Sequence, residues 1–377
     1  MRGSERLINL DHAATTPLRR EALEAMLPYF CDQYANASGS YASARKSRQA
    51  IDQARRETAQ AIGAKPSEIY FTSGGTEADN WAIAGTVRAA KNKRHIVTTR
   101  IEHHAVLETC RMLEQQGYSV TWIDPDQKGR ISVKSVRSAI REDTALVSVM
   151  LANNEIGTIE PVSEMASAAH EAGALMHTDA VQAVGHIPVR VDELGVDLLS
   201  MSAHKFYGPK GIGALYIRDG VRIEHLMQGG AQERNMRPGT ENVPAIVGMG
   251  TAIRIACERM NETAASTSAL RDRLESMVAV LPGVHINGDR AHRLPGHLHI
   301  SVQGMRSQLL LMRLDMAGVA ASAGSACSSG SLERSHVMQA LGFGAEQQAD
   351  IRFSIGENNT ADEIERAADV LGRILMK

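Results

Sequence analysis

Short apolar and β-branched runs alternate with amphipathic stretches along most of this 377-residue chain. The stretches Glu77–Ala90, Ala105–Gln116 and Val162–Glu171 repeat apolar residues at helical spacing. The runs between such stretches predict strands at Glu68–Phe71, His95–Thr98, Ser119–Ile123, Ala145–Met150, Leu175–His177, Asp197–Met201 and Ala214–Ile217. Because parallel strands need a crossover connection, this alternation predicts a mostly parallel sheet with helices on both faces. Ligands of such sheets bind beyond the carboxyl ends of the strands.

The pattern changes after about Asn242. Two long helical stretches, Ala245–Met260 and Ser266–Val280, are followed by a mixed region. Its predicted elements are the strands His297–Val302, Gly318–Ala321 and Ile351–Ile355 and the helix Ala361–Leu375. We therefore expect an α/β fold in two parts: residues 15–255 form a large domain with a mostly parallel sheet of the seven-stranded type, and residues 256–377, with part of 1–14, form a smaller α+β domain.

Composition excludes several classes of protein. Forty-one Lys and Arg against 43 Asp and Glu give a net charge of −2, so no general basic surface is expected to bind nucleic acid. No apolar run approaches the roughly 18 to 20 residues that span a bilayer. The four cysteines show no C-x-x-C and no metal-ligand spacing, which is typical of reduced thiols in a cytoplasmic protein. We expect no resident metal site.

Phosphate binding is one interpretation of the segment Phe71–Glu77. A predicted strand runs into Ser-Gly-Gly-Thr, and a helix follows. Glycines let backbone N–H groups converge, and a helix N-terminus favours an anion. The alternative is a tight strand–helix turn with Thr76 as the N-cap. The local sequence favours neither.

Lys205 and Asp179 each follow a predicted strand. A lysine at the carboxyl end of a buried strand loses hydration, and its free amine can then form a Schiff base. An aspartate there can keep a pyridine nitrogen protonated. Taken singly, a solvated loop lysine and a helix N-cap are the commoner cases. Ser202-x-x-Lys205 also matches S-x-x-K, but the companion motifs of acyl-enzymes are absent.

Nine blocks of sequence, in order along the chain, carry a resemblance to a known family. They are LDHAATTP (10–17), FTSGGTEADN (71–80), EHHAVL (102–107), NNEIGT (153–158), HTDAVQAVG (177–185), SAHKFYGPKGIG (202–213), RPGTENV (237–243), SAGSACSSGSLE (322–333) and IRFSIG (351–356). The chain resembles cysteine desulfurases of the NifS/IscS type. These belong to the class V aminotransferase-like branch of fold-type I pyridoxal-phosphate enzymes.

The resemblance implies a set of cofactor-binding residues. Lys205 matches the lysine that bonds to pyridoxal 5'-phosphate, Asp179 the partner of its pyridine nitrogen, and Gln182 the partner of its ring hydroxyl. His103 matches the catalytic histidine that stacks on the ring and moves protons. The phosphate ligands implied are Gly75, Thr76, Ser202, His204 and, from the other subunit of a homodimer, Thr240.

The resemblance also implies a substrate site. Asn154, which borders the cofactor, and Arg352 match the groups that hold the carboxylate of L-cysteine. A planar guanidinium suits that task because it grips a carboxylate through two hydrogen bonds. By itself, Arg352 in a strand is more often part of a surface ion pair.

Cys327 lies among Ser, Ala and Gly, none of which is large enough to pack, so we expect an exposed and mobile loop. It matches the family nucleophile. By contrast, Cys31, Cys110 and Cys257 have apolar helical neighbours, which favours core packing for all three.

The function implied is conversion of L-cysteine to L-alanine with a persulfide left on Cys327. The sulfur would pass to an acceptor protein, either an iron–sulfur scaffold or a thiolation enzyme for tRNA or cofactors. Cys327 is then the one candidate for a metal contact, as a transient iron–sulfur ligand. A selenocysteine lyase or another class V enzyme is the first alternative, and a non-catalytic sulfur carrier or assembly scaffold is the second.

Three places depart from the family pattern. The segment Asn36–Tyr41 reads NASGSY where Asn-Pro-Ser-Ser-x-His is usual, and Ala203 replaces a common glycine. His297 and His299 lie in a strand where Asn-rich sequence is usual. None of them is a residue to which the resemblance assigns chemistry, so we expect the chemistry to be retained.

Overall fold

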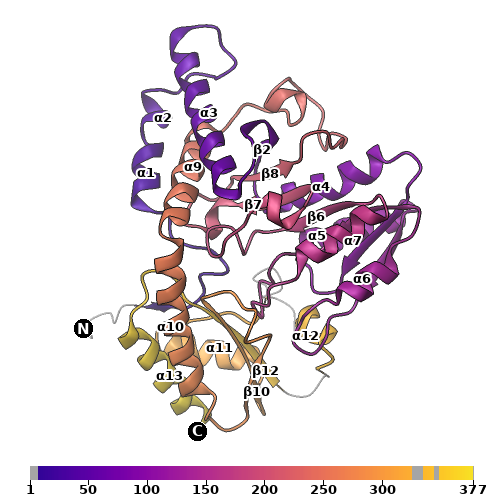
Figure 1. The fold of residues 1–377 in the computed structure, drawn as a ribbon. Coiled ribbons are helices and arrows are strands. Elements are labelled where there is room, and N and C mark those ends of the chain that lie inside the picture. Colours follow the sequence, from indigo (N-terminus) through magenta and orange to yellow (C-terminus); the bar gives the residue numbers. More distant parts are fainter. Residues whose placement is uncertain (1–6, 325–333, 344–347, 377) are drawn as a thin grey trace.

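The computed structural model describes residues 7–324, 334–343 and 348–376 (Figure 1). Its largest sheet has the predicted size and mostly parallel character. From edge to edge the strands are β2 (Ile69–Thr72), β8 (Gly213–Ile217), β7 (Leu198–Ser202), β6 (Leu175–Asp179), β5 (Thr144–Ser148), β3 (His95–Thr99) and β4 (Ser119–Ile123).

Strand β8 is antiparallel to both of its neighbours, β7 and β2, whereas the other pairs are parallel. Only residues 203–212 separate β7 from β8. A parallel return needs a crossover of a dozen or more residues, so this short connection turns the chain back antiparallel.

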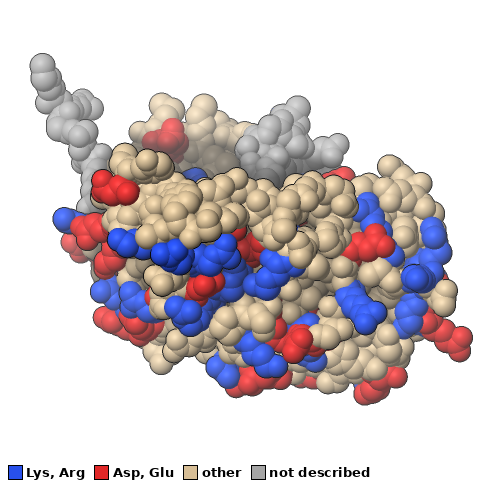
Figure 2. Space-filling model, turned by 90° about the horizontal axis from the view of Figure 1, so that it is seen from above, with Lys and Arg blue, Asp and Glu red and all other residues tan. Residues whose placement is uncertain are grey.

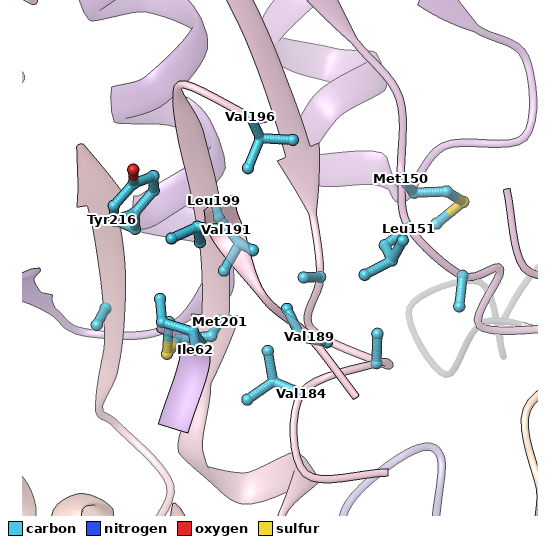
Figure 3. Close-up of a cluster of buried hydrophobic side chains, with 14 of the residues drawn as sticks. Ile62, Met150, Leu151, Val184, Val189, Val191, Val196, Leu199, Met201 and Tyr216 are labelled. Atoms are coloured by element: carbon cyan, nitrogen blue, oxygen red, sulfur yellow. The ribbon is translucent and has the colours of Figure 1, made fainter. Parts of the chain in front are cut away.

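Each face of the sheet has its own hydrophobic core, because successive side chains of a strand point to opposite faces. Leu198 packs on one side with the helices α4 (Gly75–Ala89) and α5 (His104–Gln115). The next residue, Leu199, packs on the other side with Val196 and Met201 (Figure 3). The helices and turns that complete this part are α1 (Arg20–Met26), α2 (Pro28–Cys31), α3 (Ala42–Ile62), η1 (Pro66–Glu68), α6 (Val133–Ala139), α7 (Val162–Glu171), α8 (Val191–Leu194), η2 (Ala203–Lys205), η3 (Glu233–Asn235) and α9 (Val243–Glu258).

A second core lies in the C-terminal part. Its three-stranded antiparallel sheet has the order β12 (Gln348–Ser354), β10 (His297–Gln303), β9 (Val284–Asn287). The other elements there are α10 (Met260–Val278), α11 (Ser307–Met316), β11 (Val319–Ala320), α12 (His336–Ala340) and α13 (Ala361–Leu375).

The N-terminal segment connects the two parts. Strand β1 (Ile8–Asn9) pairs in parallel with β11, and Ile8 and Leu10 belong to the second core. A few residues later, the Thr16 backbone N–H donates to the carbonyl of His204, which follows β7, at 3.0 Å. Residues 10–16 therefore run from the second core to the carboxyl end of the large sheet.

An ion pair fixes the loop between β8 and α9. The Arg55 guanidinium on α3 donates to both carboxylate oxygens of Glu233, at 2.6 and 2.7 Å, and both side chains are buried. Glu233 also accepts from the backbone N–H of Phe71 at 2.9 Å. The pair thus holds the loop that leads to Thr240 against α3 and β2.

The structure differs from expectation at several elements. Helices α1, α2 and α11 and strand β9 were not predicted, and the expected strand Gly318–Ala321 shrinks to two residues in β11. Helix α12, although it lies late in the chain, packs into the core of the large sheet through Val337 and Met338. The expectation that Cys31 is packed was wrong, because its thiol is exposed at the end of the short helix α2, whereas Cys110 is buried and Cys257 half-buried.

On the face shown in Figure 2, Lys and Arg are interspersed with Asp and Glu. Within the described part of the chain, no helix is both long and apolar enough to cross a membrane. A search of the same residues finds no group of three or more His, Cys, Asp or Glu placed to hold a metal ion.

Candidate active site

A cavity of about 230 Å³ lies at the carboxyl ends of β6 and β7. It brings together ten of the residues that the sequence singled out: Gly75, Thr76, His103, Asn154, Asp179, Gln182, Ser202, His204, Lys205 and Arg352. Ala13, Ala14, Asp79, Met150, Ala152 and Val181 complete its lining. Thr240 does not line it and is exposed on the loop before α9. Cys327 lies outside the described residues.

One end of the cavity is built around the N-terminus of α4. Gly75 is the first residue of this helix, and a Cβ there would come within 2.7 Å of Val181 Cγ2. At the start of β8, a Cβ on Gly213 would lie 2.8 Å from the backbone of Gly74, the residue before α4. These glycines let the helix end approach the sheet, so its positive dipole end lies beside Ser202 and His204, as an anion site requires.

Lys205 is held by backbone carbonyls. Its Nζ donates to the carbonyl oxygens of Ala13 at 2.6 Å and Ala14 at 2.9 Å. Gln182 Nε2 donates to the same Ala13 oxygen at 3.1 Å. The N-terminal segment, whose LDHAATTP block carried the resemblance but no assigned role, therefore positions the amine.

Asp179 is the last residue of β6 and is buried. Its Oδ1 accepts from the Val181 backbone N–H at 2.9 Å. Burial raises the pKa of this carboxyl to about 6, against the lowering effects of that hydrogen bond and of Lys205. No cation of the described part of the chain is in hydrogen-bond contact with this buried carboxylate, which therefore suits a cationic ring nitrogen.

His103 is the N-cap of α5, where its Nδ1 accepts from the Ala105 backbone N–H at 3.1 Å. Burial, with the positive charge of Lys205, lowers the pKa of His103 to about 4, so the imidazole is neutral near pH 7. Because Nδ1 is already an acceptor, the proton of the neutral ring lies on Nε2. In this geometry His103 is a hydrogen-bond donor through Nε2, and a role as base at Nε2 requires the other tautomer.

Arg352 also lines the cavity and is almost fully buried. One terminal nitrogen donates to Asp11 Oδ1 at 2.7 Å and the other to the Asn154 carbonyl at 2.8 Å. Its Nε has no hydrogen-bond partner among the described residues. A guanidinium that lines the cavity and is fixed by two hydrogen bonds suits a carboxylate ligand.

The departures from the family pattern lie in different surroundings, and Nε2 of both His297 and His299 is buried without a hydrogen-bond partner among the described residues. The Ala203 methyl is buried, and a Cβ on Gly208 would lie 2.8 Å from it, so the glycine makes room for that methyl. His299 is buried and its Nδ1 lies 2.9 Å from Asn287 Nδ2. Tyr41 is exposed.

Sequence reasoning missed two acids here. Asp11 pairs with Arg352, and Asp79 lines the cavity from α4. Both stand inside quoted blocks, but only the fold brings them to the site.

Taken together, these residues fit pyridoxal 5'-phosphate. The helix N-terminus with its polar side chains could hold the phosphate, Asp179 could accept a hydrogen bond from the ring nitrogen, and Lys205 could supply the amine for the aldehyde. Among the described residues no cation forms an ion pair with the buried Asp179 carboxylate, so a pyridinium would supply its counter-charge.

Comparison with known proteins agrees with this site. The family model described as aminotransferase class-V matches residues 8–367. The chain is 48% identical over 372 residues to a cysteine desulfurase IscS of Methanosarcina thermophila, covering 98% of this chain and 92% of that protein. It is 49% identical over 376 residues to a cysteine desulfurase IscS of Dictyoglomus turgidum, covering 99% and 95%.

A solved structure of a NifS-like protein superimposes with a TM-score of 0.93 at 37% identity, covering 98% of this chain and 99% of that one. Matches of this extent in sequence and structure confirm the expected family. The chain belongs to the class-V aminotransferase family, in its branch of pyridoxal-phosphate-dependent cysteine desulfurases.

Proposed function

We propose that this protein takes sulfur from L-cysteine, releases L-alanine and holds the sulfur as a persulfide on Cys327. The observation that carries the proposal is one cavity lined by an amine, Lys205, by a buried carboxylate, Asp179, and by a guanidinium that two hydrogen bonds hold in place, Arg352. When bound there, pyridoxal 5'-phosphate supplies an electron sink that makes bonds to the substrate's α-carbon and β-carbon labile.

The chain's own residues have separate tasks in this proposal. Arg352, which lines the cavity, binds the substrate carboxylate and so orients the amino acid. Lys205 moves the α-proton with its Nζ once the carbonyls of Ala13 and Ala14 release it. His103 carries its proton on Nε2, because Nδ1 accepts from Ala105. From Nε2 it donates a hydrogen bond that orients the group bound in the cavity.

The sulfur-transfer step falls to Cys327. Its thiolate attacks the substrate sulfur, so an S–S bond forms while the C–S bond breaks. The electron pair of the broken bond stays with the carbon, which takes a proton and leaves as alanine. No external oxidant or reductant is consumed, because the two electrons lost when the persulfide S–S bond forms are those that stay with the carbon.

The test is alanine release from L-cysteine by the cofactor-loaded protein with a thiol reductant. We expect release in the unmodified protein and its loss in Cys327→Ala. Cys31→Ala is the matched control, because Cys31 is an exposed thiol that does not line the cavity and should be dispensable. Release that survives Cys327→Ala would refute the proposed nucleophile and favour a lyase that expels the sulfur or selenium atom directly.

We further propose a homodimer in which Thr240 of one subunit contacts the phosphate bound in the other. In support, Thr240 is exposed and lies outside its own chain's cavity, on the loop that Glu233 anchors. The sulfur acceptor is proposed to be a scaffold for iron–sulfur assembly or a thiolation enzyme, met in the cytoplasm. Sedimentation with and without cofactor tests the dimer, and Thr240→Ala should weaken cofactor binding without changing the sedimentation of the protein.

A further inference from the structure

A second buried carboxyl, that of Asp79, lines the same cavity. Asp79 stands on α4, one helical turn after Gly75, and lines the cavity with Asp179. Only 1% of Asp79 and 5% of Asp179 is exposed. Two carboxylates this deeply buried in one small cavity repel each other when both are ionised.

Among the described residues, no charged cation pairs with Asp79. The nearest candidate is His177, whose Nε2 lies 3.6 Å from Asp79 Oδ1. The two ring nitrogens of His177 are already engaged, at 2.8 Å from Ser148 Oγ and 3.0 Å from Ser200 Oγ. Burial lowers the pKa of His177 to about 3, so this ring is neutral near pH 7.

The Oδ1 atom of Asp79 is buried and has no hydrogen-bond partner among the described residues. An ionised oxygen in that position would be costly, whereas a protonated carboxyl removes the charge. The other groups that act on Asp79 favour the same state. Burial, and then the negative charges of Asp179 and Glu102, raise the pKa of Asp79, and a hydrogen bond from Ser200 only partly opposes them.

We propose that Asp79 and Asp179 share one proton in the cofactor-free cavity and release it to solvent when pyridoxal 5'-phosphate brings its protonated ring nitrogen to Asp179. The cavity then holds two carboxylates and one pyridinium, so its net charge is unchanged, because the pyridinium replaces the proton that leaves. Asp79 is a positioning residue in this scheme, because it acts through Asp179. The inference rests on the proposed function in one respect, that Asp179 faces the ring nitrogen.

The test counts the protons released or taken up when the cofactor-free protein binds pyridoxal 5'-phosphate. Calorimetric titration in buffers of different ionisation enthalpy gives this number at about pH 7.5. Asp79→Asn leaves Asp179 without its like-charged neighbour, so Asp179 is already ionised before binding. That variant should release about one proton fewer than the unmodified protein, and its affinity relative to that of the unmodified protein should fall by about tenfold per pH unit as the pH rises.

Two variants serve as controls. Asp79→Glu keeps a carboxyl at the position and should restore the proton count of the unmodified protein. Glu160→Gln removes another buried carboxyl with a raised pKa, but one that does not line the cavity, and should also leave the count unchanged. The same count in Asp79→Asn as in the unmodified protein would overturn the shared proton.

A measurement on the unmodified protein covers the case in which Asp79→Asn does not fold. The infrared difference spectrum between cofactor-loaded and cofactor-free protein should lose one carbonyl band of a protonated carboxyl, and an unchanged band would also overturn the proposal. The variant Asp179→Asn tests the proposed orientation of the cofactor separately from the shared proton. If that variant binds pyridoxal 5'-phosphate as tightly as the unmodified protein, the proposed cofactor orientation fails, whatever the count at Asp79.

Discussion

Removing the Glu233 carboxylate would leave the Arg55 guanidinium buried without its counter-charge. Side-chain exposure is 9% for Arg55 and 4% for Glu233, so water screens neither group well. Breaking a buried pair by deleting one partner costs about 3–5 kcal/mol. Glu233→Ala also leaves the Phe71 backbone N–H without its acceptor. The two losses share one carboxylate, so the cost of this hydrogen bond is not added to that of the ion pair. We expect Glu233→Ala to lower the free energy of unfolding by about 3–5 kcal/mol.

Urea denaturation at one fixed protein concentration measures this loss, since a dimer's stability depends on concentration. The double variant Arg55→Met/Glu233→Leu should recover part of it, because no charge is then left buried. Glu24→Ala is the control, since it breaks a pair with Arg20 that is exposed and should leave the unfolding curve unchanged. A Glu233→Ala variant within about 0.5 kcal/mol of the unmodified protein would show that the pair contributes no net stability, and would refute the reasoning.

Two further perturbations follow from other parts of the fold. Gly75→Ala places a methyl 2.7 Å from Val181 Cγ2, and overpacking of about 1–3 kcal/mol should raise the Kd for pyridoxal 5'-phosphate by roughly 5- to 150-fold, measured by fluorescence titration. Gly372→Ala, in the helix α13 with only ordinary contacts, should not change it. Burial raises the pKa of Glu160 to about 8 from 4.5, so its contribution to stability is lost as pH rises between those values. Glu160→Gln should therefore become progressively more stable than the unmodified protein from pH 5 to pH 9 in urea denaturation, and a pH-independent difference would contradict this.

Elements with a strong period could be predicted from the sequence. Val162–Glu171 and Ala361–Leu375 have the predicted bounds, because one face of each helix is apolar and the other polar. Helix α11 was missed because its run Leu309-Leu310-Leu311-Met312 is apolar on every side and has no period to detect. The direction of β8 depends on the length of one connection, which no property of the strand itself encodes.

The candidate site was predictable where motif and chemistry coincide, as at Lys205 and Asp179. Its remaining contacts join segments far apart in sequence. Arg352 meets Asp11 across 341 residues, and Lys205 meets Ala13 across 192. These long-range contacts form only when both hydrophobic cores have formed, so no pattern in the local sequence predicts them.

The pairing of β1 with β11 has a consequence for synthesis of the chain. Ile8 lies opposite Val319, so the first strand to leave the ribosome waits for more than 300 further residues before its partner exists. At about 5–20 residues per second, that wait is roughly 15 to 60 seconds. During this time the large sheet can fold, but the cavity lacks Arg352, which follows Val319 in the chain. The site is therefore assembled last, and a nascent chain released before residue 319 would carry a folded sheet without a completed cavity.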